Sequence, residues 1–296
     1  MTTTGTKIVT LKNGYHLWTR TDGAGPIPLL CLHGGPGGTH EVFENFSQRL
    51  EHYHVQVSFY DQLGSYFSES PDWSQPANRD QYFNVAYYVD EVEAVRQALG
   101  LDQFYLLGQS WGGVLAQEYA LKYGQHLKGL ILSSMIDNIA EYTANINALR
   151  EQQFSKRAVI YMQDVERRHA FGEPRYQKLI AELGNHHLHR ATAPQPHHLV
   201  STLATDIYNY FQGDNEFVMV GALKDWDLRD KIQYINVPTY LTVGENDTMP
   251  LAAVKRMAAT IPNAQYHVTP GAGHGQMIDN PLDYFKHLGE FLTQRH

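Results

Sequence analysis

The sequence is poor in features that mark several large classes of protein. Its 296 residues include one cysteine, Cys31, so an internal disulfide is excluded. Cys31 lies in an apolar run, where we expect a buried small side chain rather than a reactive thiol. No apolar stretch approaches the ~20 residues of a membrane-spanning helix. The Thr-rich residues 1–7 also lack the apolar core of a signal peptide, so we expect a cytoplasmic protein without membrane contact.

Long runs of like charge are absent as well. The formal net charge is −8, and no extended basic segment could follow a nucleic-acid backbone. We find no internal repeat and no low-complexity segment. Hydrophobic residues make up 43% of the chain and charged residues 18%, values typical of a globular protein with a large core.

Strand-like and helix-like stretches alternate through most of the chain. Asn13-Gly14 separates two short strand-like runs and predicts a hairpin. The alternation that follows predicts an α/β fold with a mostly parallel sheet and helices on both faces. Strands are expected at 8–11, 15–18, 28–32, 55–60, 104–107, 130–132, 239–243 and 265–268, and helices at 86–99 (ended by Gly100), 114–123, 252–261 and 282–292.

The pattern changes between residues 138 and 222. Strand-like runs disappear, and the segment becomes helix-like and rich in Arg, His, Gln and Glu. We interpret it as a helical cap inserted into a core formed by residues 1–137 and 223–296. In such folds ligands bind beyond the carboxyl edge of the sheet, so the cap is expected to cover that edge.

One pentapeptide, Gly108-Gln109-Ser110-Trp111-Gly112, matches the pattern G-x-S-x-G. A buried strand is expected before it and a helix after it, which is the setting of a nucleophilic serine on a sharp turn. The flanking glycines are needed where side chains would clash in such a turn. The competing interpretation is a chance match in a glycine-containing turn between a strand and a helix.

A serine hydroxyl needs a base before it becomes a nucleophile. After a turn of this kind the partners follow in the order acid, then histidine, each behind a strand. Asp247 and His274 meet both conditions, and we expect His274 to act as the base and Asp247 to orient it. Taken alone, His274 could be a loop histidine between glycines and Asp247 a helix cap. Glu245 and Asp137 are the rival acids.

The glycine-rich stretch 33–38 follows the predicted strand at 28–32. Its backbone can approach a developing oxyanion closely, so we expect the N–H groups of Gly35 and Trp111 to form the oxyanion hole. The alternative is a phosphate-binding loop. However, no Lys-Ser or Lys-Thr pair follows the glycines, so this is not a Walker motif.

Three motifs together, His33-Gly34-Gly35-Pro36-Gly37, Tyr60-Asp61-Gln62-Leu63-Gly64-Ser65 and Gly108 to Gly113, resemble the prolyl aminopeptidase (proline iminopeptidase) family. The stretches 213–217 and 224–227 are similar to the return from cap to core in the tricorn-interacting and bacterial members. The resemblance covers nearly the whole chain and is weakest across residues 140–210. It implies an α/β-hydrolase fold with a helical cap, and release of an N-terminal residue, often proline, from short peptides or amides.

The resemblance also implies that cap glutamates bind the free amino group of the substrate. Glu216 matches one such position, whereas Thr248 stands where some members carry a second glutamate. From the residues alone, Glu216 could instead lie in the first turn of a helix capped by Asp214 or Asn215. A carboxylate that binds the terminal ammonium of a peptide would favour cleavage after the first residue, as in an aminopeptidase, over cleavage within the chain, as in an endopeptidase.

No motif implies a metal or an organic cofactor. His186-His187-Leu188-His189 and His197-His198 lack carboxylate or cysteine ligands at a suitable spacing, and we interpret them as parts of a helical face. Phe67, Phe217 and Trp226 could line a pocket for a proline-like ring, although such aromatic residues more often only pack.

The sequence therefore predicts a serine aminopeptidase or L-amino-acid amidase that acts on small peptide or amide substrates. Two other functions stay open. The same three residues would serve a carboxylesterase or lactonase without recognition of a free amine. A non-catalytic binding module on the same fold is disfavoured by the complete serine, acid and histidine order.

Overall fold

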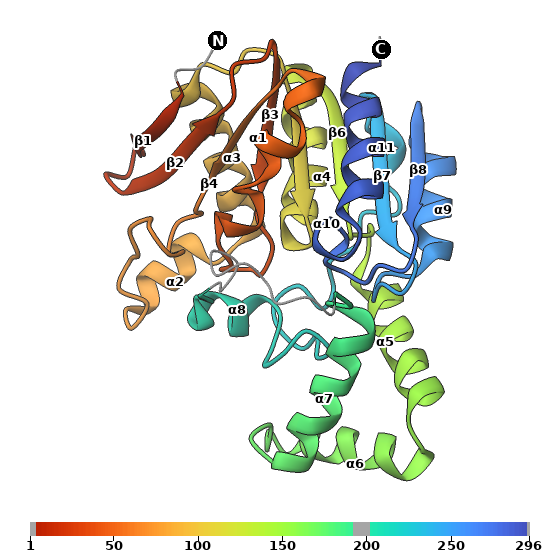
Figure 1. Cartoon of the computed structure of the whole chain (residues 1–296). Helices are drawn as coiled ribbons and strands as arrows, with labels where there is room; N and C mark the ends of the chain where they lie inside the picture. Colours follow the sequence, from red (N-terminus) through yellow and green to blue (C-terminus); the bar gives the residue numbers. More distant parts are fainter. Residues whose placement is uncertain (1–3, 192–201, 295–296) are drawn as a thin grey trace.

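An eight-stranded sheet forms the centre of the computed structural model, which describes residues 4–191 and 202–294 (Figure 1). The strand order is β1-β2-β4-β3-β5-β6-β7-β8. β2 runs antiparallel to both of its neighbours, β1 and β4, and all other strand pairs are parallel, so the predicted mostly parallel sheet is confirmed. The strands are β1 (Gly5–Thr10), β2 (His16–Asp22), β3 (Ile27–Leu32), β4 (Val55–Tyr60), β5 (Phe104–Gln109), β6 (Leu127–Ser133), β7 (Thr239–Gly244) and β8 (Ala264–Thr269).

The first two strands form the hairpin that Asn13-Gly14 predicts. Gly14 has φ +91°, a backbone conformation that side chains other than glycine rarely adopt, and its N–H donates to the carbonyl of Leu11. The central strand β5 is buried at every position. This burial on both faces explains why its sequence is a continuous apolar run rather than an alternating one.

Helices cover both faces of the sheet, and two apolar cores result. Val92, Leu115 and Met257 contribute to one core, while Phe46 and Phe285 contribute to the other. Cys31 is buried in the second core, as expected. The first core is covered by α3 (Val85–Leu99), α4 (Trp111–Tyr123) and α9 (Leu251–Thr260), and the second by α1 (Phe46–Arg49), α10 (Gln276–Asp279) and α11 (Pro281–Thr293).

The boundary between α3 and β5 follows the sequence prediction. Gly100 ends α3 in the left-handed conformation with φ 69°, and its N–H donates to the carbonyls of Arg96 and Gln97. None of the helices within residues 4–191 and 202–294 combines the length and apolar character needed to cross a membrane.

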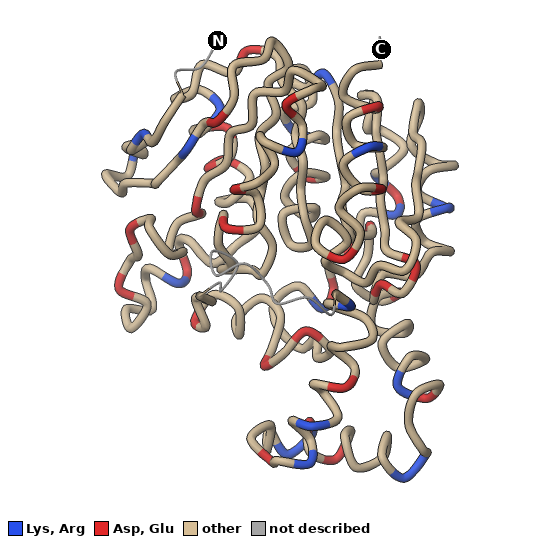
Figure 2. The backbone as a smooth tube through the Cα atoms, viewed as in Figure 1, with Lys and Arg blue, Asp and Glu red and all other residues tan. Residues whose placement is uncertain are grey.

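The segment from 138 to 222 contributes no strand to the sheet over its described residues. Figure 1 shows its helices gathered beyond the carboxyl ends of the parallel strands. An isolated bridge links Asn138, at the start of the segment, to Asp227, just beyond its end. Basic and acidic residues are interspersed along it and along the rest of the backbone (Figure 2). The helices are α5 (Ile139–Gln153), α6 (Lys156–Arg167), α7 (Pro174–His187) and α8 (Thr205–Phe211), and α2 (Pro76–Tyr82) lies outside it.

Candidate active site

Ser110 lies on a sharp turn between β5 and α4. Its backbone has φ 54° and ψ −122°, a conformation that costs energy for any residue other than glycine. The turn is crowded, because a Cβ atom at Gly108 would lie 2.1 Å from the carbonyl oxygen of Gly112. A Cβ atom at Gly112 would lie 2.2 Å from the carbonyl oxygen of Leu32. The steric need for both glycines is thus confirmed, and Ser110 is presented at the carboxyl edge of the sheet.

His274 and Asp247 lie together at the same edge. Nδ1 of His274 is 2.9 Å from Oδ1 of Asp247, which also accepts a hydrogen bond of 3.1 Å from the N–H of Met249. The carboxyl side chain of Asp247 is fully buried. Asp247 does not cap α9, since that helix begins after Pro250.

The rival acids have other partners. Asp137 is buried and accepts hydrogen bonds of 2.7 and 2.9 Å from the Arg256 guanidinium. Glu245 accepts a hydrogen bond of 2.8 Å from the N–H of Gly271. Asp247 is therefore the carboxylate that the fold places on the imidazole of His274.

The electrostatics of the pair favour the charged imidazole. Burial lowers the pKa of His274, but the carboxylates of Asp247 and Glu216 outweigh it and raise that pKa to about 9. Burial likewise opposes ionisation of Asp247, yet His274 holds the pKa of this carboxyl below its usual value. Nε2 of His274 is buried and has no hydrogen-bond partner among the described residues. In the neutral imidazole this nitrogen can take a proton from a neighbouring group, and Ser110 and His274 line one cavity.

The end of α7 holds the loop that carries His274. The N–H groups of His274 and Gly275 donate to the carbonyls of His187 and Leu188, both at 2.8 Å. Nδ1 of His187 in turn donates to the carbonyl of Asn246 at 2.8 Å, next to the acid. The predicted cap segment thus touches both loops of the pair, a long-range contact that the local sequence does not reveal.

None of the histidines that the structure describes in this segment belongs to a cluster able to hold a metal ion. Within the described part of the chain, the one group of metal-ligating side chains is His267, Asp283 and His287, on β8 and α11. His197 and His198 lie outside the described residues. The prediction that the histidine-rich stretch is not a metal site therefore stays a prediction.

The loop after β3 closes on Ser110. A Cβ atom at Gly34 would lie 3.1 Å from Cβ of Ser110 and 3.7 Å from its Oγ. Gly35, with φ +113°, lines a small cavity together with Ser110 and Trp111, the first residue of α4. Both predicted oxyanion-hole residues therefore lie next to the serine, Gly35 on this loop and Trp111 as the residue that follows Ser110. Their role itself stays a prediction.

A chain of hydrogen bonds joins the three motifs around this loop. The indole N–H of Trp111 donates to Oε1 of Gln62 at 2.8 Å. The backbone N–H of Gln62 donates to Nε2 of His33 at 3.1 Å, and its side-chain amide donates to the carbonyl of His33. All three residues are buried. Sequence reasoning missed the positioning role of Gln62, although the motif that contains it was recognised.

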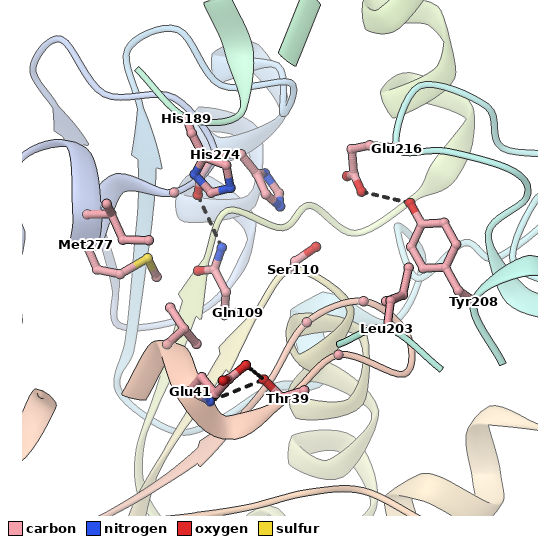
Figure 3. A pocket seen from close by; sticks show the side chains of 16 residues that line it. Thr39, Glu41, Gln109, Ser110, His189, Leu203, Tyr208, Glu216, His274 and Met277 are labelled. Atoms are coloured by element: carbon pink, nitrogen blue, oxygen red, sulfur yellow. Dashed lines mark hydrogen bonds between the residues drawn. The ribbon is translucent and has the colours of Figure 1, made fainter. Parts of the chain in front are cut away.

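A cavity of about 500 Å³, the main cavity, opens above Ser110 (Figure 3). Its volume lies in the range of small-molecule sites, roughly 300–1,000 Å³. The sheet edge, the glycine-rich loop with the residues that follow it, and the helical segment all contribute to its wall. Its lining includes Thr39, Glu41, Val42, Gln109, Ser110, Tyr208, Glu216, His274, Met277 and Ile278.

Glu216 projects into the main cavity from the helical segment (Figure 3). The hydroxyl of Tyr142 donates to Oε1 of Glu216 at 3.2 Å, and that of Tyr208 to Oε2 at 3.3 Å. No described ion pair involves Glu216. Burial raises the pKa of this carboxyl, and the charge of His274 and the two hydroxyls act against the rise. A cation that entered the cavity would relieve the burial cost of this carboxylate.

The alternative explanation of Glu216 as a first-turn helix residue is wrong. Residues 214–217 form a bend and turn, and α8 has already ended at Phe211. Thr248 is also buried, and its hydroxyl donates to Oδ1 of Asp247 at 3.2 Å rather than facing the main cavity. At this position the chain therefore supports the acid instead of supplying a second amine-binding glutamate.

The three aromatic residues that could have lined a pocket for a proline-like ring pack elsewhere. Phe67 stacks on Tyr66, the indole of Trp226 donates to Glu118, and Phe217 lines a different hollow. Another, smaller cavity of about 20 Å³, the inner cavity, adjoins Ser110 and Glu216 instead. Its walls are mostly apolar and include Pro36, Trp111, Val114, Met135, Ile139, Met219, Leu223 and Met249.

Comparison with known proteins agrees with this geometry. The sequence model of a family described as alpha/beta hydrolase fold matches residues 27–281. A proline iminopeptidase of Flavobacterium johnsoniae is 33% identical, with 94% of each chain aligned. One from Elizabethkingia meningoseptica is also 33% identical, with 96% of each chain covered. The crystal structure of a proline iminopeptidase from Mycobacterium smegmatis superposes with a TM-score of 0.85 at 26% identity, over 97% of each chain.

Proposed function

Because this chain belongs to the proline iminopeptidase family of α/β-hydrolases, it is a hydrolytic enzyme, and we propose that it releases an N-terminal residue from short peptides or amino-acid amides. The relatives are named for action on proline, so the preferred first residue is proline or another small apolar residue. The observation that carries the proposal is the Glu216 carboxylate, which faces the cavity above Ser110 without an ion-pair partner among the described residues.

The chemistry proceeds through an acyl-enzyme. Nε2 of His274 takes the hydroxyl proton of Ser110 as Oγ attacks the scissile carbonyl carbon, and the carbonyl oxygen becomes an oxyanion. The N–H groups of Gly35 and Trp111 bind this oxyanion. His274 then gives the proton to the leaving nitrogen, and the C–N bond breaks. Water, deprotonated by the same imidazole, hydrolyses the ester, while Asp247 stabilises the imidazolium in both halves.

Glu216 selects substrates with a free amine. The ammonium of the first residue binds the carboxylate that Tyr142 and Tyr208 orient. In a cavity partly shielded from water, such a charge-assisted contact is stronger than one between neutral groups. An acetylated amine has lost the positive charge and brings added bulk. It therefore leaves the carboxylate unpaired.

Amine binding also favours the reactive form of the base. The Glu216 carboxylate is one of the groups that raise the pKa of His274. An ammonium bound to Glu216 offsets that negative charge and lowers the pKa of His274. The enzyme thus gains neutral imidazole, the form that can accept the Ser110 proton, when a substrate with the correct amine is bound.

The inner cavity accounts for the preference for a small first residue. It borders both Ser110 and Glu216, so it lies where the side chain of the bound residue would point. About 20 Å³ is room for little more than one water molecule. Three methionines in its wall have flexible side chains that can move aside for a compact apolar group.

The proposal is tested with the wild-type enzyme on proline 4-nitroanilide, its alanine and phenylalanine analogues and the N-acetylated form of each. We expect the free-amine compounds to exceed the acetylated ones in kcat/KM by about 100-fold or more. We expect proline and alanine to exceed phenylalanine. Equal rates for acetylated compounds or simple esters would overturn the proposal and indicate an esterase with the same triad.

A further inference from the structure

A second carboxylate lines the main cavity, and the proposed mechanism does not use it. Glu41 lies on the short 3-10 helix His40–Phe43, and only 7% of the residue is exposed. The hydroxyl of Thr39 donates to its Oε2 at 2.7 Å. None of the ion pairs among the described residues involves Glu41, whereas Glu44 on the same turn pairs with His40. Glu41 therefore presents a negative charge to the cavity that no described cation balances.

The position of Glu41 relative to Ser110 decides what it can contact. In Figure 3 Glu216 lies on one side of Ser110 and Glu41 on the other. When the substrate amine is at Glu216 and the scissile carbonyl is at Ser110, the leaving group extends away from Glu216. Met277 is labelled on that side as well (Figure 3), and Val42 and Ile278, the sequence neighbours of Glu41 and Met277, also line the cavity.

We infer that Glu41 determines the leaving-group specificity of this enzyme, favouring cationic and neutral leaving groups over anionic ones. The preferred substrates are then amides and peptides with Lys or Arg in second position. Peptides with Asp or Glu there, and dipeptides with a free carboxylate next to the scissile bond, are disfavoured. The physical cause is charge: like charges repel strongly where little water screens them, and opposite charges attract. The inference rests on the proposed function for the direction in which the substrate lies.

A purely structural role for Glu41 makes a different prediction. Thr39 caps the short helix through the N–H of Glu41, so the Thr39–Glu41 contact could serve only to stabilise that turn. Glu41→Gln separates the two roles, because the amide oxygen can still accept from Thr39 while the charge is lost. A structural defect would lower kcat/KM for all substrates alike. Loss of the charge would instead change their order.

The experiment compares kcat/KM for Pro-Lys-NH2, Pro-Gln-NH2 and Pro-Glu-NH2, whose C-termini are all neutral. For the wild type we expect the lysine compound to exceed the glutamate compound by about tenfold or more, with glutamine between them. In Glu41→Gln we expect this spread to shrink to within about twofold, with the glutamine compound little changed. The matched control is Glu44→Gln, which removes the same charge outside the cavity wall and should keep the wild-type order.

Equal kcat/KM values for the three compounds in the wild type would contradict the inference. So would a ratio between the lysine and glutamate compounds that stays unchanged in Glu41→Gln. Failure of the proposed function gives a different result, namely equal cleavage of the N-acetylated peptides or cleavage of none. A second pair of substrates then still tests Glu41 without any amine. Acetylcholine and its neutral isostere 3,3-dimethylbutyl acetate differ only in the charge of the leaving group. The wild type should prefer the cationic ester, and Glu41→Gln should lose that preference; equal rates in both proteins overturn the inference.

Discussion

The indole N–H of Trp111 donates a hydrogen bond of 2.8 Å to the side-chain oxygen of Gln62, and this contact joins the turn that carries Ser110 to the loop after β4. Gln62 in turn donates hydrogen bonds from its backbone N–H and its side-chain amide to His33, at the start of the glycine-rich loop. Two loops and one turn that are far apart in the sequence are thereby fixed relative to one another. Both predicted oxyanion-hole residues, Gly35 and Trp111, belong to the elements that this network connects.

Trp111→Phe tests the energetic value of this contact. It removes the donor and leaves the buried oxygen of Gln62 unsatisfied, which should lower the free energy of unfolding by roughly 1–3 kcal/mol beyond the loss of ring volume. Trp226→Phe is the matched control, because its indole donates to Glu118 at 3.0 Å in a partly exposed position. Urea denaturation of both variants measures the difference. Equal losses would show that the Gln62 contact adds no stability.

The crowding of the turn that carries Ser110 gives a second prediction. In Gly112→Ala the new methyl group would lie 2.2 Å from the carbonyl oxygen of Leu32, so the turn and β3 must separate. We expect a loss of at least about 3 kcal/mol in the free energy of unfolding, or failure to fold. Gly124→Ala is the control, since apart from the adjoining backbone no atom lies within 4 Å of the added methyl group. A stable, active Gly112→Ala variant would mean that the turn is not the constrained structure described above.

The choice of acid is tested by two matched substitutions. Asp247→Asn removes the charge that stabilises the imidazolium of His274, so kcat should fall by about 10³–10⁴-fold while the fold is kept. Asp137→Asn weakens the pair with Arg256, so it should lower stability but leave most of the activity. Steady-state kinetics and thermal denaturation of both variants separate these effects. If Asp137→Asn instead lost the activity and Asp247→Asn kept it, Asp137 would be the acid that supports His274.

A pH profile tests the influence of Glu216 on the base. Burial lowers the pKa of His274, but Asp247 and Glu216 raise it to about 9, so the neutral imidazole forms only toward that pH. Inactivation by an uncharged fluorophosphonate needs neutral His274 and involves no substrate amine. Its rate should therefore rise with pH to a midpoint near 9. In Glu216→Gln one negative charge that stabilises the imidazolium is lost, so the midpoint should move to lower pH.

The control for this profile is Glu151→Gln, an exposed substitution of the same kind on α5, which should leave the midpoint in place. Coincident midpoints in the wild type and in Glu216→Gln would contradict the electrostatic coupling. The absence of any inactivation would contradict the nucleophilic role of Ser110 itself.

The local sequence carries a large part of this site. A strand, a crowded glycine turn and a helix are successive in the chain, so the position of Ser110 can be predicted from neighbours within a few residues. Asp247 and His274 can be predicted because parallel strands β7 and β8 end at the same edge of the sheet, whatever fills the rest of the fold. Composition and periodicity likewise predict the sheet and the helices on both of its faces.

What escapes the sequence depends on contacts between distant segments. The link from Gln62 to Trp111 and the hold of His187 on the His274 loop need the folded chain, because neither has a local pattern. The suggestion that Phe67, Phe217 and Trp226 could line the substrate pocket fails for the same reason, and the packing role holds instead. Phe67 stacks on Tyr66 and the indole of Trp226 donates to Glu118. The local sequence does not distinguish such protein partners from a ligand. Glu41 was missed because a single glutamate on a short helix has no motif.

The central claim is that Glu216 reads the free amine of the substrate, and the most direct test is the ratio of kcat/KM for proline 4-nitroanilide to that for its N-acetylated form in Glu216→Gln. We predict that this ratio falls about 100-fold from the wild-type value, while the rate on the acetylated compound holds or rises because more His274 is neutral. Asp214→Asn, an exposed change two residues away, should keep the wild-type ratio. A ratio that stays at the wild-type value in Glu216→Gln would contradict the account and leave Glu216 a structural residue.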